Sequence, residues 1–148
     1  MSGCLNRQPD TKIKMISTKG RYAIRVLIDL AESGGSGYTP MKAIAMRQGL
    51  SLKYLERIIP ALTKAGLIEG MHGAGGGYRL LKDPKDLTVG EILELTETDM
   101  ASVACLSRNA EPCERRQECR TVAMWEGYQK LTNDYFNGIK LADLCREP

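Results

Sequence analysis

The chain has 148 residues, of which 43% are hydrophobic and 26% are charged, and its formal net charge is +3. This size and composition indicate one small soluble globular unit and argue against a two-domain enzyme, and no apolar run approaches the roughly 20 residues that a membrane-spanning helix needs. The positive charge is concentrated in residues 15–89, with eleven Lys and Arg against six Asp and Glu. This asymmetry favours polyanion binding, and a solvated basic surface is the alternative.

The first fourteen residues, MSGCLNRQPDTKIK, are polar and lack the apolar core of a signal peptide. We expect residues 1–14 to form a disordered leader, with Cys4 outside the fold and Met15 as a possible natural start, in a cytoplasmic protein. The five cysteines of the chain are an odd number, which argues against a disulfide framework and toward metal or redox chemistry. Buried inert thiols are the alternative, and Cys145 is best interpreted that way.

Two helices are predicted first. Thr18 is expected to cap the first one, which has apolar residues at helical spacing and ends at the glycines between residues 34 and 37. Thr39 followed by Pro40 predicts the start of a short second helix, and Gly49 predicts its end.

A third helix and a hairpin follow. Ser51 is expected to cap a helix that closes at Gly66, with Leu52 among its inward-facing residues and with Pro60 kinking it or loosening its last turn. In LIEGMHGAGGGYRLL, two strand-like runs flank a glycine-rich tip at 73–77, which predicts a hairpin. A short helix, a glycine turn, a longer helix and a hairpin together predict a winged helix-turn-helix over residues 15–87.

Residues 88–148 are predicted to form a second region. Thr88 is expected to cap a short helix, and the segment CLSRNAEPCERRQEC follows it. The stretch TVAMWEGYQKLTNDYFNGI then predicts a long helix with an aromatic stripe, which consists of Val122, Trp125, Tyr128, Leu131, Tyr135 and Ile139. Such a stripe is usually core, but a chain this small has little core to cover it, so we assign it to a dimer interface. The expected fold is mainly α with a small β-hairpin wing, followed by a cysteine loop and a long dimerisation helix.

The three close cysteines, Cys105, Cys113 and Cys119, would spread over about 20 Å in a helix. Only an irregular loop could bring them together, and their spacing does not suit the paired cysteines of structural zinc sites. Soft sulfur ligands suit an iron-sulfur cluster, which nearby arginines would favour electrostatically; these are Arg108, Arg115, Arg116 and Arg120. Thiol-only redox sensing, zinc binding and a purely structural role remain the alternatives.

Exposed residues early in the third helix are candidates for DNA contact, namely Ser51, Lys53, Tyr54, Glu56 and Arg57. Arg57 could read guanine and Glu56 could accept from cytosine, whereas the others suit phosphates or base edges. In the hairpin, His72 and Arg79 are candidate groove or phosphate contacts, and Tyr78 is expected to pack. For any one of these residues, a solvated surface is the alternative.

The phrases STKGRYAIRVLIDLA, SLKYLERI, AGLIEGMHGAGGGYRL and LTVGEILE resemble the IscR and NsrR family of bacterial winged-helix regulators. The resemblance extends from Met15 to about Leu144. It implies a homodimeric transcription factor that binds palindromic double-stranded DNA, with many members carrying an iron-sulfur cluster on the cysteines that match Cys105, Cys113 and Cys119. Val122 stands where IscR-like members have a histidine as fourth ligand, so the fourth ligand and the cluster type, 2Fe-2S or 4Fe-4S, are unassigned. Family carry-over favours Ser51, Lys53, Tyr54 and Glu56 for DNA contact.

The sequence therefore predicts a dimeric DNA-binding regulator, such as a repressor, that senses iron-sulfur or redox status, and not an enzyme. The alternative is a cluster-free regulator of the same fold, controlled by thiol oxidation or a protein partner, as in relatives that control cysteine metabolism. A redox enzyme or electron carrier fits poorly, because the chain has no CxxC and its single histidine has no evident nucleophile beside it.

Overall fold

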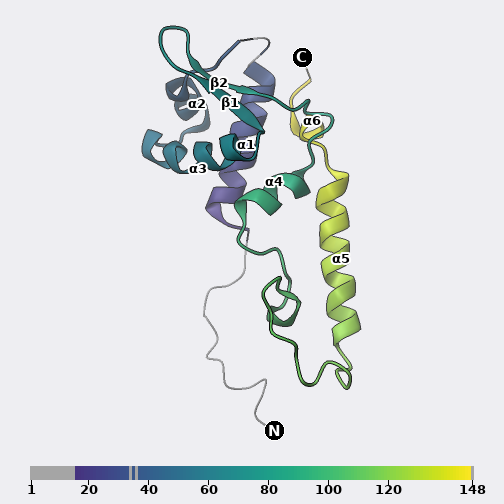
Figure 1. The fold of residues 1–148 in the computed structure, drawn as a ribbon. Helices are drawn as coiled ribbons and strands as arrows, with labels where there is room; N and C mark the ends of the chain where they lie inside the picture. Colours follow the sequence, from purple (N-terminus) through teal and green to yellow (C-terminus); the bar gives the residue numbers. More distant parts are fainter. Residues whose placement is uncertain (1–15, 34, 36, 148) are drawn as a thin grey trace.

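A computed structural model describes residues 16–33, 35 and 37–147. The predicted leader, Cys4 and Met15 lie outside these residues. The described part is mainly helical with one antiparallel hairpin, as predicted (Figure 1). Its elements, in chain order, are α1 (Thr18–Ser33), α2 (Met41–Gln48), α3 (Leu52–Lys64), β1 (Ile68–Met71), β2 (Gly77–Leu80), α4 (Val89–Thr96), the short 3-10 helix η1 (Ala104–Leu106), α5 (Val122–Gly138) and α6 (Leu141–Leu144).

The cap of helix α1 is Ser17, not the predicted Thr18, which is the first residue of the helix. The Ser17 hydroxyl accepts a hydrogen bond from the Gly20 N–H at 3.0 Å and donates to the Glu97 carboxylate at 2.7 Å. The same carboxylate accepts from the Ser17 N–H at 3.0 Å. A carboxylate at a helix N-terminus is favourable, so the end of α4 is tied to the beginning of α1 by contacts that span 80 residues of sequence.

The hairpin is anchored to the entry of α2. Thr39 and Tyr78 exchange two backbone hydrogen bonds of 2.8 Å, which leaves Pro40, not Thr39, as the residue that precedes α2. Gly77 has a φ of 149°, and a Cβ there would overlap the Thr39 carbonyl, so this close approach requires glycine. The predicted glycine end of α2 is confirmed, since Gly49 is left-handed with a φ of 63°.

Helix α3 begins as predicted, because the Ser51 side chain accepts from the Tyr54 N–H at 3.1 Å. Pro60 does not end the helix, which continues to Lys64; its ring lies on the exposed side and the missing N–H costs only one hydrogen bond. The expectation that Leu52 faces inward is wrong, because this side chain is 39% exposed. It lies in the first turn, beyond the edge of the core that the later apolar residues of α3 reach.

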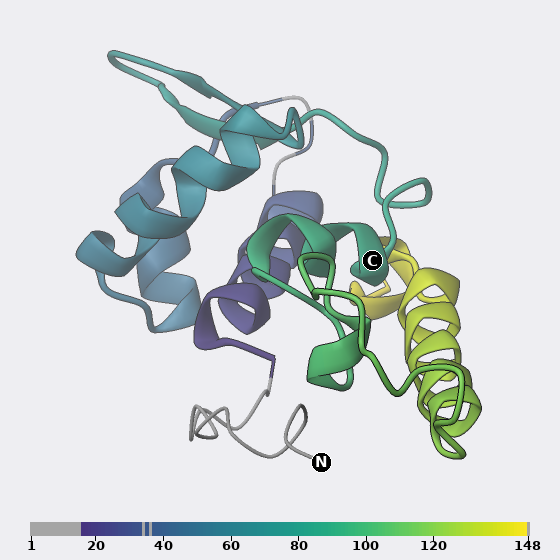
Figure 2. The same cartoon turned by 60° about the horizontal axis from the view of Figure 1, so that its bottom comes forward.

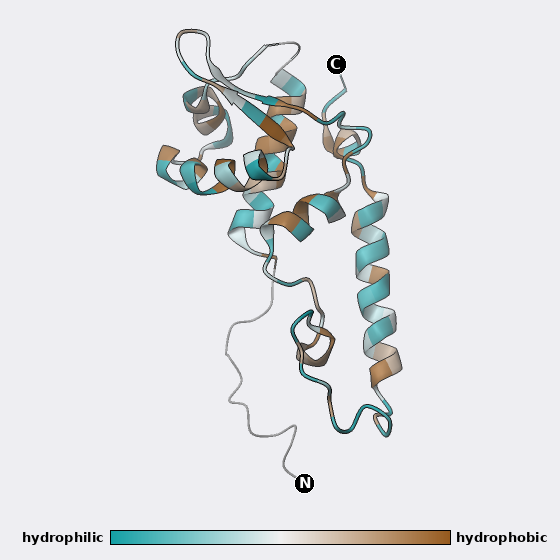
Figure 3. Cartoon of the chain, in the orientation of Figure 1, coloured by the Kyte–Doolittle hydropathy of each residue, from teal (hydrophilic) through white to brown (hydrophobic). Residues whose placement is uncertain are grey.

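The core surrounds α1, which packs against α2, α3, α4 and α6. Hydrophobic residues are concentrated in α1 and α4 in Figure 3. Buried side chains from both predicted regions belong to one cluster, which includes Ala23, Val26, Leu27, Ile44, Leu55, Ile58, Leu62, Leu87, Ile92 and Leu141. Burial of this kind stabilises by roughly 25 cal/mol per Å², so the helix-turn-helix and the segments after residue 87 support each other.

A buried carboxylate joins α1 to α2. Asp29 is only 4% exposed, and it accepts hydrogen bonds from Arg47 at 2.7 and 3.0 Å and from Gln48 at 3.0 Å. Burial by itself would raise the pKa of Asp29, but the hydrogen bonds from Arg47 and Gln48 and the charge of Arg47 outweigh it, so the pKa lies below its ordinary value of about 3.8. The ionised carboxylate is therefore the stabilising form.

Asp29→Asn is expected to lower the free energy of unfolding at pH 7 by about 2 kcal/mol, because it weakens charge-assisted hydrogen bonds to Arg47. A depressed folded-state pKa contributes stability above pH 3.8 that declines as pH falls below that value. Urea unfolding at fixed protein concentration should show a smaller difference at pH 3 than at pH 7, because protonation of the carboxylate begins to remove the contribution below pH 3.8. The exposed Asp86→Asn is the control, and a difference for Asp29→Asn that persists undiminished at pH 3 would contradict this assignment.

Helix α4 begins with a capping box at Thr88, as predicted for its cap. The Thr88 hydroxyl accepts from the Glu91 N–H at 3.0 Å, and the Thr88 N–H donates to the Glu91 carboxylate at 2.8 Å.

Helix α5 extends beyond the core. Its C-terminal end is held at the start of α4, where the Val89 N–H donates to the Ile139 carbonyl at 2.9 Å. No residue of α5 is buried, and the helix runs along the side of the molecule away from α1 to α3 (Figures 1 and 2).

Candidate nucleic-acid interface and metal centre

The exposed face of α3 carries most of the predicted DNA contacts. Ser51, Lys53, Glu56 and Arg57 are exposed. Tyr54 is half-buried, and its ring meets that of Tyr22 edge-on with centroids 5.3 Å apart, so packing fixes its orientation. Lys53, Glu56 and Arg57 are thus accessible to a ligand, and Tyr54 is accessible only in part.

Lys64 is a further cation of α3 that is absent from the predicted DNA contacts. It is exposed at the last position of α3. Residues four and seven apart lie on one side of a helix, so Lys53, Arg57 and Lys64 share a side of α3. The 3.6-residue period of the helix could have identified Lys64 as a third cation on this face.

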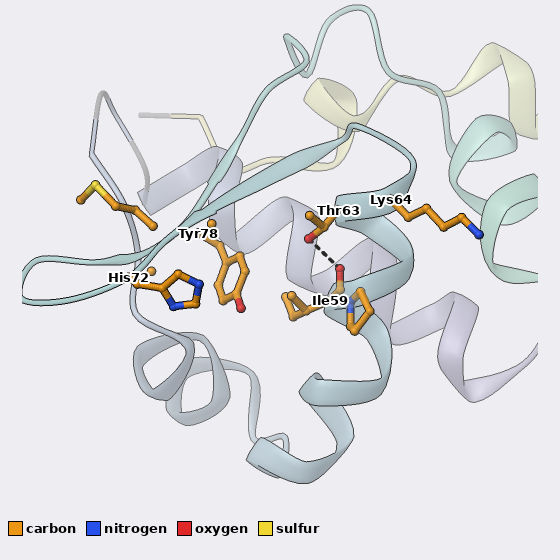
Figure 4. Close-up of a pocket in the computed structure, with 9 residues that line it drawn as sticks. Ile59, Thr63, Lys64, His72 and Tyr78 are labelled. Carbon is orange, nitrogen blue, oxygen red and sulfur yellow. Dashed lines mark hydrogen bonds between the residues drawn. The ribbon is translucent and has the colours of Figure 1, made fainter.

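A groove of about 530 Å³ separates α3 from the wing. Ile59, Pro60, Thr63 and Lys64 line it from α3, and the hairpin lines it with Gly70, Met71, His72, Gly77 and Tyr78. His72 and Tyr78 lie on its wing side and Lys64 extends away at the opposite end (Figure 4). Tyr78 is half-buried and packs against the core, which agrees with its predicted packing role.

Arg79 lies at the base of the wing, not at its tip. It forms an ion pair with Glu69, its partner across the two strands, and its guanidinium lies 4.9 Å from the centroid of the Tyr38 ring. These contacts hold an Arg that is still 42% exposed in its side chain. Arg79 is therefore oriented, but part of its charge is offset by Glu69.

The cysteine segment, residues 105–119, has an irregular backbone that folds around a hollow. Residues 113–119 form successive turns, in which Arg116 N–H donates to the Cys113 carbonyl and Glu118 N–H to the Arg115 carbonyl, both at 3.0 Å. Cys105, Cys113 and Cys119 all line one hollow of about 510 Å³ at the start of α5. Its other lining residues are Val103, Arg115, Glu118, Arg120, Thr121, Val122 and Trp125. The three thiols thus line one hollow, although 13 residues lie between the outer two in the sequence.

The four arginines near the thiols divide into two pairs. Arg115 and Arg120 line the hollow. Arg108 instead forms an ion pair with Glu94 of α4, and Arg116 forms one with Glu126 of α5. The cysteine segment is therefore tied to both helices that flank it.

The thiols differ in acidity. Hydrogen bonds from the side chain and backbone of Thr121, and the charge of Arg115, lower the pKa of the Cys119 thiol. Burial, and then the charge of Glu32, raise the pKa of Cys145, whose thiol donates to the Leu141 carbonyl at 3.4 Å. Cys119 is thus suited to act as a ligand or nucleophile, whereas the environment of Cys145 is that of a structural thiol.

Within the described residues, no three His, Cys, Asp or Glu side chains are grouped closely enough to hold a single metal ion. A cluster distributes its ligands over at least two irons, so its thiolates lie farther apart than those of a mononuclear site. Three thiols around a hollow with two arginines fit such a group in donor type and charge. Val122, at the position of the family's histidine, lines the hollow and offers no donor.

A helix with an exposed cationic side, a glycine-tipped wing and a separate thiol-lined hollow together are typical of a winged-helix transcriptional regulator. The chain belongs to the Rrf2 family, described as "Iron-dependent Transcriptional regulator", whose model matches residues 16–147. A family of transcriptional regulators implies DNA binding, and the relatives that match this chain are HTH-type transcriptional regulators, not enzymes.

Three relatives illustrate the similarity. The HTH-type transcriptional regulator IscR of Klebsiella pneumoniae is 33% identical over 129 residues, which are 87% of this chain and 78% of IscR. The structure of CymR, the global cysteine regulator of B. subtilis, is similar with a TM-score of 0.71 and 34% identity over 89% of this chain and 96% of CymR. The structure of T. potens IscR is similar with a TM-score of 0.69 and 36% identity, over 88% of this chain and 85% of that IscR chain.

Among the helices of the described part, none is long and apolar enough to cross a membrane.

Proposed function

We propose that this chain is a homodimeric transcriptional regulator whose DNA binding is set by an iron-sulfur cluster held by Cys105, Cys113 and Cys119. The observation that carries the proposal is that all three thiols line one hollow. A bound cluster would supply a redox-sensitive, exchangeable group at that place. The similarity to IscR regulators supports the same assignment.

The contacts of the cysteine segment give a route from the hollow to the DNA-binding half. Arg108 links this segment to Glu94 of α4, and Glu97, just after α4, accepts two hydrogen bonds from Ser17 at the start of α1. Helix α1 packs against α2 and α3. A change in the cysteine segment would therefore alter the support of the recognition helix through directly packed elements.

For DNA binding we propose that α3 enters the major groove and that the wing lies beside it. Lys53, Ser51 and Tyr54 would contact phosphates or base edges, and Glu56 and Arg57 would read bases. His72 would contact the groove beside α3, and Arg79 would contact phosphate with the part of its surface that Glu69 leaves exposed. Two subunits joined through α5 would bind an imperfect palindrome with half-sites about one helical turn, or a small multiple, apart.

The experiment that tests the proposal is anaerobic purification, followed by iron and sulfide analysis, a visible spectrum and DNA binding with and without the cluster. We expect a brown protein with stoichiometric iron and sulfide, and different DNA affinity or sequence preference in the two forms, because a group regulates only through unequal interaction with the two states. If the protein takes up neither iron nor sulfide, the proposal that it binds a cluster is wrong.

A cluster-free regulator is the second candidate, and the similarity to CymR favours it. In that case the Cys119 thiol, whose pKa is lowered by its hydrogen bonds with Thr121, would be the sensor, or a partner protein would provide control. Reduced, metal-free protein whose DNA binding changes on mild peroxide treatment and recovers with dithiothreitol would support the thiol version. DNA binding indifferent to both cluster and oxidant would leave partner control.

Lys53 and Arg57 should separate phosphate binding from base reading. Lys53→Ala is expected to weaken binding to all sequences and to reduce the slope of log affinity against log salt by about one. Arg57→Ala should cost about 1–3 kcal/mol at one base pair. Binding titrations at several salt concentrations, with operators changed one base pair at a time, measure both. If Lys53→Ala changed sequence preference at an unchanged salt slope, the roles would be wrong.

A further inference from the structure

One residue with a carboxylate lines the hollow besides the three cysteines. Of its lining residues, Glu118 carries a carboxylate, Arg115 and Arg120 carry positive charge, and Val103, Val122 and Trp125 have no oxygen donor. Iron-sulfur clusters ordinarily take four protein ligands. Three thiols therefore leave one iron site for another group.

Among the remaining lining residues, Thr121 and Glu118 have side-chain oxygens that could be the fourth ligand. The Thr121 hydroxyl lies 3.5 Å from the Cys119 sulfur, and a neutral hydroxyl is a weak ligand beside a carboxylate. Iron accepts carboxylate oxygen readily, as in sites that combine imidazole and carboxylate ligands. Glu118 is thus the better donor.

The local backbone places Glu118 beside a predicted ligand. Its N–H donates to the Arg115 carbonyl at 3.0 Å, and the Cys119 N–H donates to the Arg116 carbonyl at 3.4 Å. This turn places two neighbouring residues, Glu118 and Cys119, in the lining of the same hollow, and Glu118 is exposed. Arg116, two residues before Glu118, is paired with Glu126 of α5, which holds the turn against that helix.

We propose that the Glu118 carboxylate is the fourth ligand of the cluster, completing the set made by Cys105, Cys113 and Cys119 within one subunit. The proposal rests on the cluster-binding function proposed above. In IscR-like relatives the fourth ligand is a histidine at the position of Val122. Here the proposed donor is Glu118, four residues earlier in the sequence and immediately before Cys119. A carboxylate is exchanged more readily than a thiolate, so this iron is the one exposed to chemical attack.

The test compares protein reconstituted anaerobically with ferrous iron and sulfide as wild type, Glu118→Gln, Glu118→Cys and Glu114→Gln. Glu114 is exposed in the same segment and lies outside the hollow, so it is the matched control. Mössbauer spectra report the ligands of each iron, and the half-life of the cluster in a chelator reports its retention.

We expect Glu118→Gln to lose its cluster at least about tenfold faster than wild type, with the spectrum of one iron changed. Glu118→Cys should retain the cluster longer and show all-thiolate iron. Glu114→Gln should match wild type. The assignment of Glu118 as the fourth ligand would be wrong if Glu118→Gln and Glu114→Gln had equal half-lives and spectra. It would also be wrong if the spectrum of Glu118→Cys did not change. Wild type that takes up no iron or sulfide would instead reject the cluster itself, and the ligand with it.

Discussion

Replacing Cys105, Cys113 or Cys119 by alanine is expected to abolish the visible chromophore and reduce bound iron and sulfide to background. Each thiol lines the same hollow and would be a strong ligand of the proposed cluster, so loss of one would leave an iron site held by too few donors. Anaerobic reconstitution with iron and sulfide analysis gives the measurement. The difference in DNA affinity between cluster-loaded and cluster-free protein should disappear in the same variants.

Cys145→Ala is the control for these variants. Its thiol is half-buried beside Leu141 and lies outside the hollow, so cluster content should remain that of wild type. Circular dichroism should show that all the variants remain folded, because the cysteine segment contributes no residue to the main buried cluster. Iron and sulfide uptake that survives removal of all three thiols together would refute the ligand set.

Introducing charge into the α5 stripe should dissociate the proposed dimer. Leu131 is 72% exposed and Tyr135 is 67% exposed, and residues four apart lie on one side of the helix. Leu131→Glu would place a carboxylate in the proposed apolar interface, where an unpaired charge is costly. At micromolar concentration the variant should sediment as a monomer, and its affinity for a two-half-site operator should fall by about 100-fold or more, because binding of the second subunit is no longer intramolecular.

Lys130→Glu provides the matched change on α5. Lys130 is exposed and pairs with Asp134 on another side of the helix, so a carboxylate there should leave the protein dimeric. Footprints should remain two-fold symmetric for this variant. A wild-type chain that sediments as a monomer, or a Leu131→Glu variant that stays dimeric with full operator affinity, would show that α5 is not the interface.

The sequence by itself determined the features that depend on neighbours a few residues away. Ser51 and Thr88 cap their helices through N–H groups three residues on, because a cap needs only a short polar side chain at a helix start. Apolar spacing predicted α3 and α5, and the glycine tip predicted the hairpin. The matching phrases were distributed along the chain, so the family could also be recognised before the structure was known.

Only the tertiary structure decided which distant residues meet. The cap of α1 depends on Glu97, 80 residues from Ser17, and Asp29 is buried because Arg47 and Gln48 reach it from another helix. Leu52 has an apolar side chain at helical spacing, yet it lies beyond the edge of the core, which no periodicity specifies. Arg79 carries a full positive charge in the sequence, but pairing across the strands places it against Glu69, which offsets part of that charge. Glu118 was one acidic residue among several until the turns of its segment placed it in the hollow with the three thiols. The physical reason is common to all of these: local propensities fix elements, but the long-range contacts of a side chain depend on how those elements pack.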